Sequence, residues 1–134
     1  GATDGHGKNF SLHHHTGGTY GMTPLYDVLS AWPIIGHGKN QLAIEKVKLA
    51  MSLRGQRAHY RLNEITARHW QELAGRTAER DLWRRIQSFV EAAPAALERV
   101  ETRLPRVFPE RVYATIRDGV RAQVQRFTQT TGQM

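Results

Sequence analysis

The stretch that decides the fold is Gly1-Ala2-Thr3-Asp4-Gly5-His6-Gly7-Lys8-Asn9, at the start of the chain. Within it, a carboxylate, Asp4, is followed five positions later by an amide, Asn9. A second carboxylate, Asp27, comes after a segment with the pattern of a β-hairpin, whose turn is Thr16-Gly17-Gly18. Because a hairpin returns the chain to its starting point, we expect Asp4 and Asp27 to lie near each other.

An Asp followed five residues later by an Asn is the spacing of the protein-kinase catalytic loop. There the Asp accepts the proton of the substrate hydroxyl and the Asn binds magnesium, while another metal-binding Asp lies downstream, where this chain has Asp27. On spacing alone, Asp4 also fits a turn aspartate in a glycine-rich loop, so both interpretations stay open at this point.

Four stretches extend this pattern: Ala2-Thr3-Asp4-Gly5-His6-Gly7-Lys8-Asn9-Phe10-Ser11, Gly17-Gly18-Thr19-Tyr20, Thr23-Pro24-Leu25-Tyr26-Asp27 and Leu29-Ser30-Ala31-Trp32-Pro33. Together they resemble the C-terminal lobe of the HipA persistence-toxin kinases. Fainter similarity continues through residues 48–51, 67–70, 94–97 and 104–110, so that it covers nearly the whole chain. The resemblance implies a mainly α fold with short β-hairpins, that of a protein-kinase-like (HipA-like) C-terminal lobe.

The resemblance assigns a catalytic role to Asp4, as general base or positioner of the attacking serine or threonine hydroxyl. It makes Asn9 and Asp27 the Mg²⁺ ligands, and both side chains carry the hard oxygen atoms that this ion prefers. Two departures are visible. Gly7 replaces the alanine expected in the family, and Val28-Leu29 follow Asp27 where ordinary protein kinases have Phe-Gly, a difference that the HipA-like family shares.

The resemblance also implies that His6, Lys8 and Tyr26 belong to the ATP site, together with Asn9 and Asp27. Lys8 would neutralise charge on the transferred phosphoryl group, and His6 would hydrogen-bond the nucleotide or orient Asp4. Tyr26 would line the adenosine side, although a half-buried packing aromatic is an equally open interpretation. The implied cofactors are ATP and Mg²⁺.

For partners, the resemblance implies a DNA-binding antitoxin, operator DNA contacted through the antitoxin complex, and a protein substrate, in the family a glutamyl-tRNA synthetase. Basic side chains shortly after the His-aromatic helix touch DNA in this family, but Gly75 and Ala78 fall near the expected places here. Arg76 and Arg80 are the displaced candidates. The second hypothesis is accordingly a catalytically inactive basic helical module that binds an antitoxin and operator DNA.

The composition adds weak constraints on partners and location. Nineteen Lys and Arg against 12 Asp and Glu give a net charge of +7, which favours an anionic partner or simply keeps the chain soluble. The absence of cysteine excludes disulfides and thiolate zinc sites and fits a cytoplasmic location. No apolar stretch approaches the about 20 residues of a membrane helix, so we expect no membrane association.

The start of the chain suggests a fragment. It begins at Gly1 without an initiator Met or a signal-like leader, and it has no phosphate-covering loop or nucleotide-binding lysine of a kinase N-terminal lobe. We therefore expect the N-terminal lobe to be absent and this segment alone to be inactive. The expected divisions are a catalytic loop at 1–9, a hairpin with the metal-binding Asp at 10–28, a second hairpin at 47–63 and a helical bundle at 66–127.

The helical bundle carries clear local signals. Thr66 is a candidate N-cap, Ile65 and Trp70 suit a hydrophobic staple, and Gly75 suits a helix end. A stripe spaced by three or four residues follows, which we expect to be core: Leu82, Ile86, Phe89, Ala93, Leu97, Val100 and Leu104. Pro94 is expected to kink or split this helix. The last helix should begin near Pro109, and the polar tail 128–134 should fray.

A repeated glycine-rich motif and a run of histidines suggest further sites, but neither is expected to be one. Residues 36–40 repeat the sequence of residues 5–9, but Ile35 stands where Asp4 would be, which favours a flexible glycine loop over a second site. Three consecutive histidines, residues 13–15, raise the question of a metal site. On a strand only His13 and His15 point to the same side, and we expect no physiological metal there.

Overall fold

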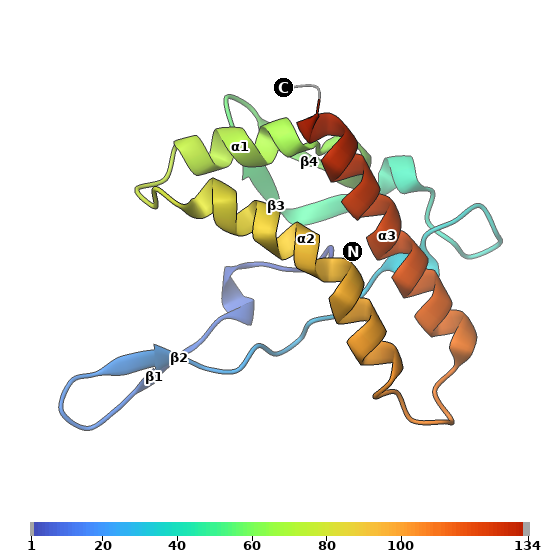
Figure 1. The fold of residues 1–134 in the computed structure, drawn as a ribbon, viewed down its shortest axis with the longest axis horizontal. Coiled ribbons are helices and arrows are strands. Elements are labelled where there is room, and N and C mark those ends of the chain that lie inside the picture. Colours follow the sequence, from blue (N-terminus) through green and yellow to red (C-terminus); the bar gives the residue numbers. More distant parts are fainter. Residues whose placement is uncertain (1, 133–134) are drawn as a thin grey trace.

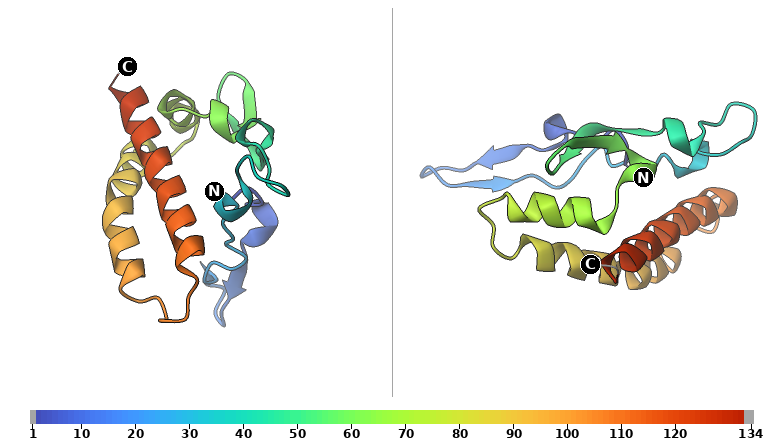
Figure 2. Two further views of the ribbon diagram at one scale, coloured as in Figure 1. Left: turned by 90° about the vertical axis from the view of Figure 1, so that its right-hand side faces the viewer. Right: turned by 90° about the horizontal axis from the view of Figure 1, so that it is seen from above.

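The structure is a computed structural model and describes residues 2–132. Its elements are β1 (Leu12–His14), β2 (Tyr20–Met22), β3 (Lys48–Arg54), β4 (Ala58–Arg61), α1 (Ala67–Gly75), α2 (Leu82–Glu101) and α3 (Glu110–Thr131). The hairpins and the N-terminal segment form one layer and the helices a second, with α2 and α3 side by side (Figures 1 and 2). The fold is therefore mixed, with three helices and two small antiparallel hairpins in the described residues.

Both predicted hairpins are confirmed. In the first, β1 and β2 pair with Leu12 opposite Met22, and Gly17 and Gly18 form the turn at φ values of 90° and 80°. Such angles favour glycine because it has no Cβ to clash with the backbone. In the second, β3 pairs with β4 around a turn at 55–57, with an irregular register between Lys48 and Leu53.

Helix α1 has the predicted ends, since it begins after Thr66 and includes Gly75 as its last residue. The Thr66 backbone N–H donates to Nδ1 of His69 at 3.0 Å. His69 therefore takes the place that Glu or Gln has in an ordinary capping box, satisfying a backbone donor that the helix itself leaves free.

The predictions for the two long helices are partly wrong. Of the two outcomes expected at Pro94, a kink or a split, the split is wrong, since α2 runs through Pro94 as one helix. Its stripe is not core: no residue of α2 is fully buried, Phe89 is 80% exposed and Val100 is 47% exposed. Helix α3 extends to Thr131 instead of ending near residue 128, and the hydroxyl of Thr130 accepts the Ala67 N–H of α1 at 3.1 Å, which attaches this end of the helix to its neighbour. Residues 133 and 134 of that tail lie outside the described residues.

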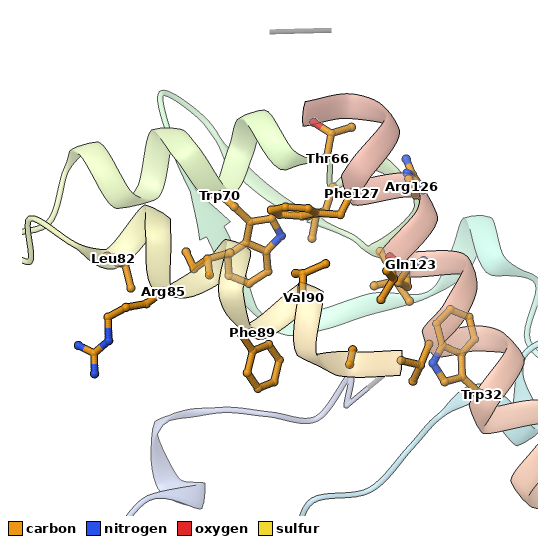
Figure 3. Close-up of a pocket in the computed structure, with 16 residues that line it drawn as sticks. Trp32, Thr66, Trp70, Leu82, Arg85, Phe89, Val90, Gln123, Arg126 and Phe127 are labelled. Atoms are coloured by element: carbon orange, nitrogen blue, oxygen red, sulfur yellow. The ribbon is translucent and has the colours of Figure 1, made fainter. Parts of the chain in front are cut away.

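The first half of the stripe stays half-covered because it lines an open groove of about 600 Å³, bordered mainly by the three helices and on one side by Trp32, Leu62 and Ile65. Trp70 of α1, Val90 of α2 and Phe127 of α3 line this groove, and Trp32 lies at its other end (Figure 3). An amphipathic pattern reports which face of a helix is apolar, but it cannot report how closely the facing layer approaches.

The buried core lies instead where the loop after β2 meets β3 and α3. Its members are Trp32, Val47 and Leu62, against which Ile35, Ile44, Leu49 and Ile116 pack. Trp32 begins the short 3-10 turn η2 (Trp32–Ile34), which contacts α3. Gly119 of α3 faces the indole so closely that a Cβ at this position would overlap the ring carbons. Glycine is therefore required here for close approach.

The loop at residues 36–40 is closed by backbone hydrogen bonds. Gly36 N–H donates to Leu42 at 3.1 Å, and Leu42 N–H donates to Ile34 at 2.7 Å. Asn40 takes a positive φ of 66°. Within residues 2–132, no helix combines the length and the apolar character needed to cross a bilayer.

Replacing Gly119 by Ala should destabilise the fold. Alanine favours a helix by about 0.5–1 kcal/mol over glycine, but overpacking a core costs about 1–3 kcal/mol and should dominate against a rigid indole. Urea denaturation should therefore show a net loss of stability. Gly75→Ala is the matched control, because a Cβ there meets no atom within 4 Å. Equal effects of the two substitutions would contradict the role given to the Trp32 contact.

Candidate functional site

The Asn9 side chain is held rigidly by its own loop. Residues Gly7–Asn9 form the 3-10 turn η1, in which the Asn9 N–H donates to the His6 carbonyl at 3.0 Å. In return, Oδ1 of Asn9 accepts a hydrogen bond from the His6 N–H at 2.8 Å. Asn9 is only 8% exposed, so its amide is both oriented and shielded from water.

Asn9 also contacts Asp27, which lies 18 residues further along the chain. Nδ2 of Asn9 donates to Oδ2 of Asp27 at 3.1 Å. Asp27 has a φ of 56°, in the left-handed region that few non-glycine residues adopt. Residues held in such conformations often lie at functional sites, because the surrounding structure must maintain them. The structure therefore brings together two of the three principal residues of the predicted site.

Tyr26 provides a second link between the same two stretches. Its hydroxyl donates to the Lys8 carbonyl at 2.8 Å and lies 2.8 Å from Oγ of Ser11. Neither sequence interpretation of Tyr26 included this link. Ser11 lies within the first family motif, and the motif predicts no role for it. Only the fold, which places it opposite Tyr26, identifies its partner.

The remaining predicted residues lie on the same loop with fewer contacts. Asp4 is exposed and, within residues 2–132, its carboxylate makes no hydrogen bond or ion pair. It follows Thr3, whose carbonyl accepts the Ala50 N–H at 2.8 Å and so attaches the loop to β3. Lys8 is exposed, and Nδ1 of His6 is buried without a partner among the described atoms.

Residues 1–101 of the chain match the model of the HipA-like C-terminal domain. The chain belongs to this family. The resemblance inferred from the sequence motifs is thereby confirmed, and it relates the chain to the HipA toxin–antitoxin proteins. Helix α3 lies beyond the matched residues, although its Ile116 packs on the core that contains Trp32.

In this HipA-like domain, the donor set of Asn9 and Asp27 fits Mg²⁺. The ion takes few protein oxygens and fills its other positions with water and phosphate oxygens, so one carboxylate and one amide carbonyl suffice. Oδ1 of Asn9 accepts a single hydrogen bond, and one of its two lone pairs remains. Among residues 2–132, no group of three His, Cys, Asp or Glu is placed to hold a metal, and the rings of His13 and His15 lie 6.1 Å apart.

The two candidate DNA contacts are in different surroundings. The Arg76 guanidinium donates to the Gly55 carbonyl in the turn between β3 and β4. Arg80 is exposed in the connection between α1 and α2, and its side chain makes no hydrogen bond or ion pair with the described part of the chain. The fold therefore gives Arg76 a defined position and leaves Arg80 in solvent.

The surroundings of His69 perturb its titration. Burial, followed by the neighbouring His59 ring at 3.9 Å between centroids, lowers the pKa of His69 below its ordinary value of 6.5. Protonation would also remove the lone pair that accepts the Thr66 N–H. The unfolded chain therefore binds more protons than the folded chain as the pH falls through about 6.5.

The free energy of unfolding should consequently fall as the pH drops from about 7 to about 5. His69→Gln should flatten this dependence, because glutamine can accept the same N–H bond without titrating. Urea denaturation across this range measures the effect. His37→Gln, on the exposed loop at 36–40, makes the same chemical change away from the helix cap. A pH dependence that His69→Gln leaves unchanged would contradict the assignment.

The backbone of Asp27 predicts a ranking of substitutions. Asp27→Asn keeps an acceptor for Asn9 and a residue that tolerates positive φ, so the stability should change by less than about 1 kcal/mol. Asp27→Ala loses the hydrogen bond from Asn9. It also puts alanine, which has no polar side chain to stabilise the left-handed conformation, at a positive φ, so the free energy of unfolding should fall by about 2 kcal/mol. Denaturant midpoints measure both. Equal stability of the two variants would show that neither the contact nor the conformation is maintained in solution.

Proposed function

We propose that this chain is the C-terminal, catalytic portion of a HipA-like serine/threonine-protein kinase, with a protein-kinase-like fold. The reaction would transfer the γ-phosphate of ATP to a serine or threonine hydroxyl of a protein. The single observation that carries the proposal is the 3.1 Å contact between Asn9 and Asp27, which unites the two stretches that a kinase needs for its metal.

The chain's own residues would divide the work as follows. The substrate oxygen attacks the γ-phosphorus, the bond to the leaving ADP oxygen breaks, and Asp4 accepts the hydroxyl proton. The exposure of Asp4 suits this role, because its partner arrives only with the substrate. Asn9 and Asp27 would hold Mg²⁺, which neutralises charge on the nucleotide phosphates when bound.

Three neighbours would complete the nucleotide site. The exposed ammonium of Lys8 is free to approach a phosphate, and its carbonyl is fixed by Tyr26. His6 would hydrogen-bond the nucleotide or Asp4 once its ring turns outward, because its Nδ1 is buried without a partner among the described atoms. Tyr26 would line the nucleotide side while maintaining the link between the two stretches.

The wider setting is part of the same proposal. The nucleotide site would be completed by an N-terminal kinase lobe, in the cytoplasm. The family relation supports a DNA-binding antitoxin as partner, operator DNA contacted through that complex, and a protein substrate such as a glutamyl-tRNA synthetase. The alternative function is an inactive module that binds the antitoxin and operator DNA, favoured by the ordered position of Arg76.

The test is transfer of labelled γ-phosphate from ATP with Mg²⁺, measured on the chain within its natural polypeptide. Asp4→Asn should lower the rate by about 100-fold or more, the range expected for loss of a general base. Asp27→Asn should be at least as damaging, since it removes a charge that binds the metal while preserving the fold.

Asp81→Asn serves as the matched control, because this exposed aspartate is paired with Arg84 on the protein surface. Phosphoryl transfer that persists in both the Asp4→Asn and the Asp27→Asn variants would contradict the catalytic assignment. No transfer by the intact polypeptide, with antitoxin and DNA binding retained, would leave the binding module as the function.

A further inference from the structure

A second cluster of functional side chains lies at the turn between β3 and β4. A pocket of about 230 Å³ is lined there by Arg54, Gly55, Gln56, Arg57, Ala58 and Arg76. Three arginines therefore border one small depression, two from the hairpin and one from the end of α1. The turn lies beside α1, on the side of the molecule away from the β1–β2 hairpin (Figure 1).

The floor of the pocket is ordered by contacts to α1. Gly55 is buried, and its carbonyl accepts the hydrogen bond from Arg76. The next amide, the N–H of Gln56, donates to Oε2 of Glu72 at 3.2 Å. A Cβ on Gly55 would overlap the Glu72 side chain, so glycine allows the turn to approach the helix. The hairpin arginines are thus presented by a fixed turn.

The positive charge of this pocket is not neutralised by the described part of the chain. The nearby carboxylate, Glu72, is already paired with Arg68, with 3.3 Å between Nε and Oε1. Within residues 2–132, neither Arg54, Arg57 nor Arg76 lies within ion-pair distance of a carboxylate. Like charges gathered around one depression repel each other, and an anion that fills the space relieves the repulsion.

We propose that Arg54, Arg57 and Arg76 form a binding site for a phosphate group. The guanidinium fork matches phosphate oxygens and remains charged at any physiological pH, so three such groups around one pocket select a compact oxyanion. This site is separate from Asp4, Asn9 and Asp27 and does not rest on phosphoryl transfer. Where the phosphate is that of DNA, the site deepens the alternative function proposed through Arg76 and adds to it the two hairpin arginines, Arg54 and Arg57. The phosphate can come from the backbone of a nucleic acid or from a small phosphorylated molecule.

The experiment compares two double variants with the same loss of charge. Arg54→Ala/Arg57→Ala removes two arginines of the pocket but leaves Arg76 on its Gly55 carbonyl. Arg103→Ala/Arg106→Ala removes two exposed arginines between α2 and α3, at the far end of the helices (Figure 1). Arg54→Lys/Arg57→Lys keeps the charge, loses the fork, and provides a second test if the alanine variant does not fold.

Two probes are titrated into each folded protein at controlled ionic strength: inorganic phosphate, followed by amide NMR shifts, and a labelled DNA duplex, followed by fluorescence anisotropy. Phosphate should shift the amides of residues 54–58 and 76 in the parent and in the Arg103/Arg106 variant. These shifts should be weaker in the Arg54→Lys/Arg57→Lys variant and absent in the Arg54→Ala/Arg57→Ala variant.

For DNA bound through this site, loss of Arg54 and Arg57 should reduce the slope of log affinity against log salt by about 2, at about 0.9 per phosphate contact. The control variant should retain the parent slope. Phosphate shifts without such a DNA effect would support a small phosphorylated ligand. Equal phosphate and DNA responses in the pocket and control variants would overturn the site, because only the overall charge would then matter.

Discussion

The structure depends on the contact between Trp32 and Gly119. The indole belongs to the connection that leaves the Asp27 stretch, and the glycine belongs to the last helix, so the contact joins the two layers of the molecule. Val47 and Leu62 pack around the same indole and bring in the segments that flank the second hairpin. A single aromatic side chain therefore locates the connection after Asp27 relative to the helices, which explains why α3 carries a glycine in its interior at some cost in helix propensity.

The candidate site is built on that frame by two short-range links. The Asn9 amide reaches Asp27, and the Tyr26 hydroxyl reaches the carbonyl of Lys8, so adjacent residues of one stretch bind adjacent residues of the other. Both links join the 3-10 turn η1 to residues 26 and 27, which lie outside any strand or helix. The β1–β2 hairpin connects the two stretches along the chain, and the hydrogen bond from Asn9 attaches Asp27, whose backbone is in the left-handed conformation.

Local signals in the sequence predicted the local structure well. Turn glycines identified the first hairpin, alternation identified the second, and Thr66 with Gly75 identified the ends of α1, because each depends on neighbouring residues alone. The hairpin predicted Asp4 near Asp27, and the family motif made Asn9 and Asp27 ligands of one ion; the contact that the structure shows is the one between Asn9 and Asp27. The sequence could not reveal that the α2 stripe would face an open groove, since burial depends on the distance between layers. Nor could it reveal the grouping of Arg54 and Arg57 with Arg76, which requires the turn to pack on α1.

The position of helix α3 affects where the domain ends. The family match covers residues 1–101, yet Ile116 and Gly119, which lie beyond it, shield the Trp32 ring that the matched residues supply. A polypeptide cut at the edge of the similarity would expose this indole to water and lose the partner that fixes the Asp27 connection. The segment that the family match covers is therefore shorter than the segment that packs around Trp32.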